Sequence, residues 1–478
     1  MLRSQPRARH VKIGRYGAIV GLMLAGARRI AAQDLSQPGP YPAGWRDVTV
    51  TRPNGSTFTA AVYYPAVTSG AGAALNPAGG PYPAISFGHG FLQAVEQYRS
   101  TLAHLASWGF VVIASRSEGG LFPSHANFAA DLRHCLTYLE SANGNPAAWL
   151  YGQVRTDRFG LSGHSMGGGA SILAAAADPR VRCVANLAAA ETNPSAVSAM
   201  GSVSVPISLI AGDDDTITPV GTNGQLMYNA GRAPKQLPII RGGFHCGFVD
   251  ANFLFCDSGA LTRPAQLAIT RRLLTAFFRL YLADDASVWR AVWGPEFFAD
   301  PAVDATRAAA GVALTPGTAA LTGPAGFELS ATVTVTNSAP TARRYTLFAE
   351  GGSWPVTFAP PQTAPLAPGQ SATVEVRIAV PAGGSGDSAA LLLSARSDLD
   401  GGTRGYATWT VTRTPGRGDL NCDGQINFDD IEAFVLALGG EAGYAVAYPN
   451  CRWLNADCNA DGVVNFDDID VFVELLSG

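Results

Sequence analysis

Apolar and polar residues follow three successive patterns along this chain of 478 residues. Up to about residue 300, short apolar runs alternate with segments in which apolar residues recur at helical spacing. From about 311 to 414, apolar and polar residues alternate singly between turns rich in proline and glycine. After 418, helical spacing returns in two short segments. Continuous apolar runs are typical of parallel strands buried on both faces, and single alternation is typical of half-buried strands.

The first pattern predicts an α/β domain over residues 33–304, with a doubly wound, mostly parallel sheet covered by helices on both faces. The first two strands form an antiparallel, hairpin-like start. The predicted strands are 45–50, 57–64, 84–87, 109–114, the run that starts at 158, 181–190, 205–211 and 237–240. The predicted helices are 101–106, 128–141, the alanine-rich segment that ends at 177, and 266–282.

The second pattern predicts an immunoglobulin-like β-sandwich over residues 305–415. The predicted strands are 327–335, 343–348, 371–380, 389–395 and 405–412. This part holds no cluster of catalytic residue types. We therefore interpret it as a spacer or a binding module.

The third pattern predicts a small all-α domain over residues 416–478, which contains an internal repeat. The segment 419–430 recurs at 457–468, with oxygen-bearing side chains at positions 1, 3, 5, 9 and 12 and glycine at position 6. That spacing is typical of an EF-hand-type calcium loop, although acidic turns without metal are the alternative. The predicted ligands are Asp419, Asn421, Asp423, Gln425, Asn427 and Asp430, then Asp457, Asn459, Asp461, Val463, Asn465 and Asp468. The repeat resembles type I dockerin domains, which implies calcium-dependent docking to a cohesin-like partner or attachment to a cell surface.

The N-terminal residues 1–32 have the composition of a signal peptide. A basic region precedes an apolar stretch from Tyr16 to Ala27 that is too short to span a bilayer comfortably. Cleavage is expected after Ala27 or after Ala32, and a short membrane anchor is the alternative. We therefore expect a secreted or surface-attached protein without a membrane span after removal of the signal.

Charge and cysteine content limit the possible functions further. The formal net charge of -4 does not suggest a nucleic-acid-binding protein. Secretion permits disulfides, but seven cysteines leave at least one thiol free or paired between molecules. Cys246 and Cys256 are predicted to form a local disulfide, with free thiols as the alternative, and Cys422 with Cys451 is a possible bridge in the tail.

The segment from Gly163 to Gly167 reads Gly-His-Ser-Met-Gly and lies between a predicted strand and a predicted helix. This is the Gly-x-Ser-x-Gly nucleophile elbow of α/β hydrolases, which predicts that Ser165 is a nucleophile. A serine nucleophile needs a base and a carboxylate that orients the base, and these follow later strands in that order. Asp215 after strand 205–211 and His245 after strand 237–240 have these positions. No cofactor is required for this chemistry.

Other residues compete for these roles. Asp213, Asp214 and Glu191 are alternative acids, and position favours Asp215.

The oxyanion of an acyl-transfer reaction needs backbone N–H donors. We expect one donor from Met166 and the other from Phe91, with His89 as the alternative to Phe91. Gly90 would allow that backbone to come close.

These residues together resemble the cutinase-like polyester hydrolases, which include bacterial cutinases and poly(ethylene terephthalate) hydrolases. The resemblance covers about residues 39–282 and includes Thr51-Arg-Pro-Asn-Gly55, the elbow, and Asp215-Thr-Ile-Thr-Pro-Val220. It implies a shallow, lidless cleft for bulky or polymeric esters, with Phe91 where the family usually has tyrosine. His89, His164 and Ala190 are expected to line the substrate site. An aromatic residue common in the family falls at about Ala190, so one wall of the cleft lacks its ring.

The sequence therefore favours a secreted serine esterase that acts on lipid, cutin-like or synthetic polyester bonds. The dockerin-like tail supports an alternative, a carbohydrate esterase that removes acetyl or feruloyl groups from plant polysaccharide. A third hypothesis is a surface scaffold protein with an inactive hydrolase domain, and the complete Ser165, Asp215 and His245 set argues against it.

Overall fold

The computed structural model describes residues 34–252, 255–350, 354–382, 386–399 and 403–477. The predicted signal peptide, residues 1–32, lies outside the described residues. Within those ranges, no helix combines the length and the apolar composition needed to cross a membrane.

The first part of the chain forms a ten-stranded sheet with the order β10-β9-β8-β7-β6-β4-β5-β2-β1-β3. The strands are β1 Ala43–Thr51, β2 Thr57–Pro65, β3 Gly70–Ala71, β4 Tyr82–Gly88, β5 Val111–Ser115, β6 Val154–His164, β7 Val181–Leu187, β8 Ile207–Gly212, β9 Lys235–Ile240 and β10 Val303–Ala309. Six neighbouring strands in the centre of the sheet pair in parallel, and they are β9, β8, β7, β6, β4 and β5. The β1–β2, β2–β5 and β9–β10 pairs are antiparallel. This large, mostly parallel sheet with helices fits an α/β hydrolase.

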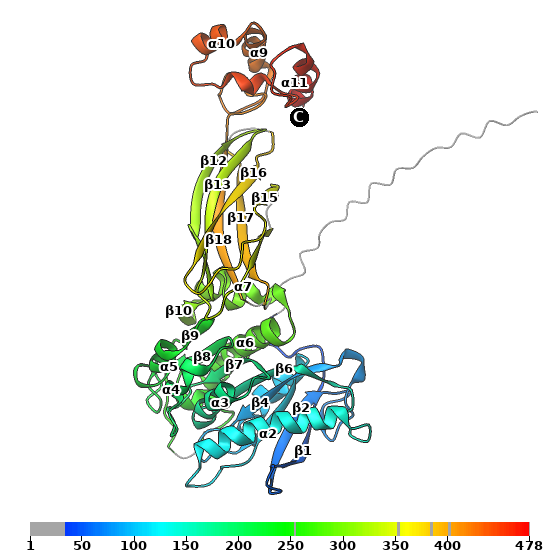
Figure 1. The fold of residues 1–478 in the computed structure, drawn as a ribbon, viewed down its shortest axis with the longest axis vertical. Helices are drawn as coiled ribbons and strands as arrows, with labels where there is room; N and C mark the ends of the chain where they lie inside the picture. Colours follow the sequence, from blue (N-terminus) through cyan, green and yellow to red (C-terminus); the bar gives the residue numbers. More distant parts are fainter. Residues whose placement is uncertain (1–33, 253–254, 351–353, 383–385, 400–402, 478) are drawn as a thin grey trace, which may run out of the picture. The chain divides into compact units, whose positions relative to one another are not determined.

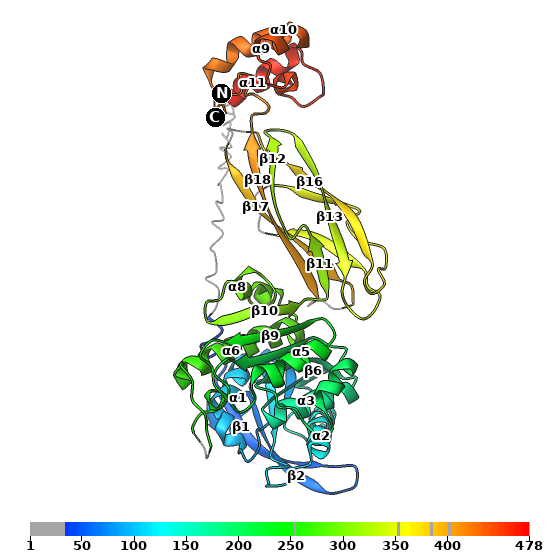
Figure 2. The same ribbon diagram turned by 90° about the vertical axis from the view of Figure 1, so that its left-hand side faces the viewer.

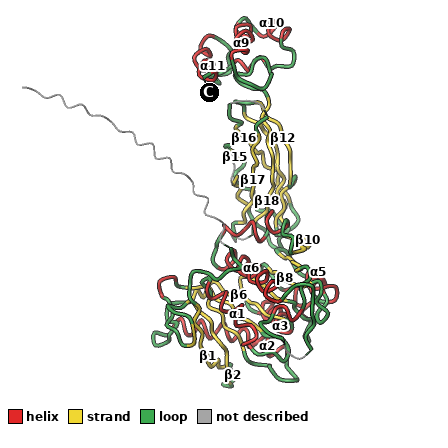
Figure 3. Tube along the Cα trace, turned by 180° about the vertical axis from the view of Figure 1, so that it is seen from behind, coloured by secondary structure: helices red, strands yellow, loops and turns green. Residues whose placement is uncertain are grey.

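Helices cover both faces of the sheet (Figures 1 and 3). The helices are α1 Arg99–Ser107, α2 His125–Gly144, α3 Met166–Ala177, α4 Ala196–Ala199, α5 Gly224–Ala230, α6 Arg263–Leu282, α7 Trp289–Val292 and α8 Pro295–Phe298. Buried apolar residues form one cluster with α1 and α6 and another with α2 and α3, and alternate strand residues belong to opposite clusters. The two clusters are the two faces of the sheet, as the apolar strand runs predict.

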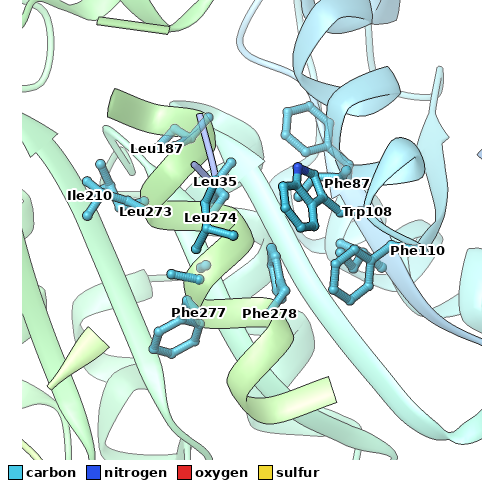
Figure 4. Close-up of a cluster of buried hydrophobic side chains, with 14 of the residues drawn as sticks. Leu35, Phe87, Trp108, Phe110, Leu187, Ile210, Leu273, Leu274, Phe277 and Phe278 are labelled. Carbon is cyan, nitrogen blue, oxygen red and sulfur yellow. The ribbon is translucent and has the colours of Figure 1, made fainter. Parts of the chain in front are cut away.

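Helix α6 packs one apolar side on the sheet (Figure 4). Its residues Leu274, Phe277 and Phe278 are fully buried, and they share a cluster with Leu187 of β7 and Ile210 of β8. Burying one such side chain contributes about 1.5–3 kcal/mol. The helix follows His245 in the chain, so this packing also anchors the segment that carries the histidine.

The predicted strand 181–190 is too long at its carboxyl end. β7 stops at Leu187, because Ala188 has a left-handed φ of 44° that an extended strand does not allow. The backbone N–H of Ala190 then donates to Ser165 O at 2.9 Å. The residues predicted as the end of a strand therefore form a loop beside the serine.

The second part holds two four-stranded sheets with the orders β11-β13-β16-β15 and β12-β18-β17-β14 (Figure 2). The strands are β11 Val312–Thr315, β12 Thr318–Pro324, β13 Glu328–Asn337, β14 Tyr345–Glu350, β15 Val356–Ala359, β16 Ser371–Ala379, β17 Ser388–Ser397 and β18 Arg404–Thr414. Alternate residues of both sheets share one apolar cluster that includes Val333, Val376, Leu393 and Trp409. The five predicted strands are all present, and β11, β12 and β15 are additional.

The last part contains the helices α9 Ile431–Leu438, α10 Glu441–Ala447 and α11 Ile469–Leu476. Both repeat loops end in a capping box, in which the side chain of Asn427 or Asn465 starts the turn that leads into the helix. The rings of Phe434 and Phe472 stack at 4.2 Å, so equivalent residues of the two repeats meet in one small core. The disulfide between Cys422 and Cys451 is present.

Candidate active site

Ser165 occupies a strained turn between β6 and α3. Its φ of 55° and ψ of -119° lie in a region that a non-glycine residue rarely adopts. The side chain is 8% exposed, because the sheet and the following helix enclose it on most sides. The sequence Gly-x-Ser-x-Gly predicts this conformation, and strain of this kind is common at functional sites.

The glycines around Ser165 allow neighbouring backbone segments to approach each other more closely than a side chain would permit. A Cβ added at Gly167 would lie 2.2 Å from Gly88 O, and one at Gly163 would lie 2.4 Å from Gly167 O. Real Cβ atoms essentially never come so close. The loop after β4 therefore lies directly against the first turn of α3, beside Ser165.

Asp215 follows β8 and is held in place by four hydrogen bonds. Its Oδ1 accepts from Ile217 N at 2.9 Å and from Thr218 N at 2.7 Å. Its Oδ2 accepts from the Thr218 hydroxyl at 2.9 Å and lies 2.8 Å from His245 Nδ1. Burial alone would raise the pKa of Asp215, but the hydrogen bonds from His245 and Thr218 lower it below the ordinary value of 3.8. The carboxylate is therefore anionic and faces one imidazole nitrogen.

His245 begins a short 3-10 turn after β9 and is buried, with 2% of its surface exposed. Because Asp215 accepts a hydrogen bond at Nδ1, the proton of a neutral imidazole belongs on Nδ1. Nε2 then carries a free lone pair and is able to accept a proton. This is the tautomer that a general base needs.

Two sets of contacts bring the loops of Ser165, Asp215 and His245 together. The ring of His164, the residue before Ser165, lies 4.5 Å from the ring of His245. The hydroxyl of Thr218 lies 3.0 Å from His245 Nδ1 and 3.2 Å from Ala188 O. The three predicted residues thus converge at the carboxyl edge of the parallel strands, where open α/β sheets bind ligands.

His164 is enclosed completely, with 0% exposure. Its Nδ1 lies 2.8 Å from the hydroxyl of Tyr98, and that hydroxyl also accepts from Gly90 N at 3.0 Å. Burial and the neighbouring His245 lower the pKa of His164 well below 6.5, so the ring is neutral. These contacts favour a role for His164 in holding the elbow and the loop after β4, rather than direct contact with a substrate.

The predicted oxyanion donors belong to segments that touch. The loop that carries Phe91 packs against the first turn of α3, which begins at Met166. Among the described residues, neither the Phe91 N–H nor the Met166 N–H has a hydrogen-bond acceptor. Free N–H groups at a helix N-terminus are suited to an anionic oxygen.

His89 follows β4 and Ala190 follows β7, the two strands that flank β6 and the Ser165 turn. His89 is 1% exposed, and its ring nitrogens lie 2.8 Å from Gly90 O and 2.9 Å from Ser117 O. It lines a surface hollow of about 290 Å³ together with Leu92 and Arg116. Ala190 is partly exposed, and its side chain is a single methyl group.

The alternative acids bind backbone groups elsewhere. Asp213 Oδ1 accepts from Gly242 N, and Asp214 Oδ2 accepts from Ala260 N at 2.8 Å. Glu191 accepts from Val197 N at 2.9 Å. Of these acids and Asp215, only Asp215 has a hydrogen bond to His245 among the described residues.

Thr218, Tyr98 and Asp257 also contact residues of the site, and they were not predicted from the sequence. Thr218 lies in the motif that follows Asp215, and the side chain of Asp215 accepts from the Thr218 backbone N–H in a local turn. Tyr98 gave no signal, because a tyrosine at a helix start is common. Asp257 directly follows Cys256 of the predicted disulfide, and this position next to the histidine loop is the one sequence feature that could have indicated its role.

The predicted disulfide between Cys246 and Cys256 is present, next to His245. Cys135, Cys183 and Cys458 are free and buried. Burial raises the pKa of the Cys183 thiol well above 9.0, so it is not a reactive thiolate.

The first repeat loop contains one buried carboxylate oxygen that has no hydrogen-bond partner among the described residues. Asp419 is 1% exposed, and its Oδ1 is buried with no hydrogen-bond partner. Burial and the nearby Asp430 and Asp423 raise the pKa of Asp419 to about 6. A buried carboxylate oxygen without a partner is a ligand type that a hard cation takes. The described residues nevertheless contain no group of three His, Cys, Asp or Glu side chains gathered as a metal site, so amide and carbonyl oxygens would have to complete one.

The fold and the site thus fit an α/β hydrolase. Comparison with known proteins narrows this class, because residues 31–258 match the PET hydrolase-like family (PETase). A bis(hydroxyethyl) terephthalate hydrolase of Streptomyces coelicolor is 29% identical over 198 residues, which are 40% of this chain and 55% of that protein. The cutinase Est1 of Thermobifida alba is 28% identical over 149 residues, or 31% of this chain and 48% of the relative. Cutinase 2 of Thermobifida cellulosilytica is 29% identical over 149 residues, or 31% of this chain and 54% of the relative.

These matches support a cutinase-like, PET hydrolase-like domain in the first part of the chain. They also support an ester hydrolase, a class that needs no cofactor for catalysis. The matched segments span about half the length of these relatives.

Proposed function

We propose that this protein is a secreted serine ester hydrolase that acts through an acyl-enzyme on bulky or polymeric esters. The observation that carries the proposal is the buried pair of Asp215 and His245, with 2.8 Å between Oδ2 and Nδ1, on loops next to the strained Ser165. This arrangement matches the requirements of a serine nucleophile and its base.

In the proposed mechanism, Ser165 Oγ attacks the ester carbonyl while His245 Nε2 takes the hydroxyl proton. The anionic Asp215 stabilises the imidazolium through its contact with Nδ1. The N–H groups of Phe91 and Met166 hold the oxyanion. His245 then protonates the leaving alcohol, and a water activated by His245 releases the acid from Ser165.

The loops around Ser165 support a bulky, apolar substrate. Exposed apolar side chains follow the carboxyl ends of β4, β5, β8 and β9, and these strands are parallel and end at one edge of the sheet. They are Phe91 and Leu92 at 44%, Leu121 at 67%, Phe122 at 96%, Ile217 at 43% and Phe255 at 84% exposure. The names of the relatives, cutinases and a terephthalate ester hydrolase, point to the same substrate class.

Phe122 offers a direct test of this apolar rim. Phe122→Ser is expected to lower the initial rate of polyester film hydrolysis about 3- to 10-fold, because less apolar area is buried on contact with the film. Hydrolysis of soluble p-nitrophenyl acetate is expected to stay within about twofold. Phe298→Ser, at a residue of α8 that is 54% exposed, is the matched control. An equal loss on both substrates, or in the control, would contradict the role of the rim.

A carbohydrate esterase is the alternative, because the repeated loops suggest a dockerin-like module that would attach the enzyme to other proteins or to a cell surface. The two functions are separated by rates on polyester film, tributyrin, acetylated xylan and feruloylated arabinoxylan. The proposed function predicts the highest kcat/KM on the first two. A clear preference for xylan would favour the alternative. Absence of fluorophosphonate labelling would favour an inactive scaffold.

We propose in addition that residues 416–478 form a dockerin-like, calcium-binding, all-α domain, separate from an immunoglobulin-like sandwich over 305–415 and a catalytic domain over 33–304. Buried apolar residues support this division, because they cluster separately in 35–305, 312–411 and 420–472. Calcium would be held by the predicted loop oxygens of Asp419 to Asp430 and of Asp457 to Asp468. When bound, it would neutralise their charge and fix the loops.

Removal of calcium is therefore expected to affect the tail alone. EDTA should make the segment 416–478 sensitive to limited proteolysis, and added CaCl2 should restore protection, whereas MgCl2 restores it weakly because Mg²⁺ prefers octahedral sites. The rate of p-nitrophenyl butyrate hydrolysis should stay within about twofold, since catalysis uses no metal. A parallel loss of esterase activity in EDTA would contradict the separation of the two functions.

A further inference from the structure

Asp257 lies between the two loops that carry the proposed acid and base. It follows Cys256, which is bonded to Cys246 by a disulfide. Its Oδ2 accepts from His245 N at 2.9 Å, and its Oδ1 accepts from Cys246 N at 2.9 Å. One carboxylate thus receives the N–H groups of two successive peptide units, beginning with that of the histidine itself.

The same carboxylate also reaches the other loop. Asp257 Oδ2 accepts from Thr216 N at 3.3 Å, and Thr216 directly follows Asp215. A single side chain therefore joins the backbone at His245 to the backbone next to Asp215. Three backbone N–H groups therefore converge on this carboxylate.

We propose that Asp257 is a positioning residue, which fixes the orientation of His245 relative to Asp215 during ester hydrolysis. This inference depends on the proposed function. The direction of an imidazole depends on the φ and ψ of its own residue, and two N–H bonds to one rigid carboxylate restrain these angles. A displacement of about 1 Å at a catalytic group can cost about 100-fold in rate.

Neighbouring contacts do not replace this one. Asp213 and Asp214 bind the start and the later part of the same segment, at Gly242 and Ala260, but among the described residues neither has a hydrogen bond to His245. The disulfide joins Cys246 to Cys256 and so carries Asp257 toward the histidine, but it makes no hydrogen bond to His245 N. Among the described residues, Asp257 provides the one side-chain acceptor for that N–H.

The test compares Asp257→Asn and Asp257→Ala in the full chain, with p-nitrophenyl butyrate as substrate and fluorophosphonate titration to count active sites. Asparagine retains one acceptor oxygen, so we expect kcat per titrated site to fall about 3- to 10-fold for Asp257→Asn and about 10- to 100-fold for Asp257→Ala. KM should stay within about twofold, because the substrate pocket is unchanged. In ¹H NMR spectra, the downfield signal of the His245 Nδ1 proton should shift or broaden in both variants.

Asp285→Asn is the matched control. Asp285 accepts from Ser287 N at 3.0 Å and pairs with Arg279, so its loss affects stability at a place that has no contact with His245. It should lower Tm without any change in kcat per titrated site. If Asp257→Asn behaves like this control, with unchanged kcat and an unchanged His245 signal, the positioning role is wrong. If the unsubstituted chain has no esterase activity, the proposed function is wrong, and this inference is wrong with it.

Discussion

Ser165→Ala is expected to reduce kcat/KM for p-nitrophenyl butyrate by about 10⁴- to 10⁶-fold, because the nucleophile and its acyl-enzyme are lost. Labelling by a fluorophosphonate probe should disappear at the same time. The fold should remain, since alanine is smaller than serine and the Ser165 side chain makes no capping hydrogen bond to helix α3. Tm should therefore change by no more than about 3 °C.

Ser198→Ala is the matched control for this experiment. Ser198 is exposed, and its backbone N–H rather than its hydroxyl takes part in the hydrogen bond to Ser195. The same chemical change at this position should leave activity and labelling intact. Residual activity in Ser165→Ala above about 1% of the original rate would show that another group is the nucleophile.

Asp215→Asn is expected to lower kcat by about 10⁴-fold with little change in KM. An amide accepts at one oxygen only, and its NH2 group would face His245 Nδ1. The imidazole would then favour the tautomer with the proton on Nε2, which cannot accept the proton of Ser165. Steady-state kinetics at a pH near 8 measure the loss, and fluorophosphonate labelling should become slower rather than vanish.

Two neighbouring acids provide unusually close controls for Asp215. Asp213 and Asp214 are its direct chain neighbours, and each binds a backbone N–H instead of the histidine. Asp213→Asn and Asp214→Asn should each lower kcat less than about 10-fold, through loosening of the histidine loop. If one of them matched the loss seen for Asp215→Asn, the assignment of the acid would have to move to that residue.

Much of the catalytic fold follows from local sequence signals. Apolar runs such as 109–114 predict buried parallel strands, and the structure has them on both sides of β4. The Gly-x-Ser-x-Gly turn predicts the positive φ of Ser165, and its flanking glycines allow the close backbone approach seen around it. The disulfide between Cys246 and Cys256 was predictable because a short loop between two cysteines offers few other partners.

Long-range polar contacts were not predictable. The Tyr98 hydroxyl contacts Gly90 and His164, which is 66 positions away, and no local pattern encodes such a contact. The end of β7 was missed because alanine, a small apolar residue, continues the apolar run at Ala188 while the backbone turns. Periodicity reports which face of an element is buried, but not where the backbone leaves the regular conformation.

The close contact between Gly88 and Gly167 sets a limit on how the proposed active site can be redesigned. A Cβ at Gly167 would lie 2.2 Å from Gly88 O. Even Gly167→Ala would therefore push the elbow away from the loop after β4. Directed evolution toward other esters should therefore leave this junction unchanged in surviving clones. Beneficial changes should instead accumulate at positions with free space toward solvent, such as Ala190, Ile217 and Phe122. The backbone around the proposed nucleophile therefore tolerates little change, whereas the exposed residues around it can vary.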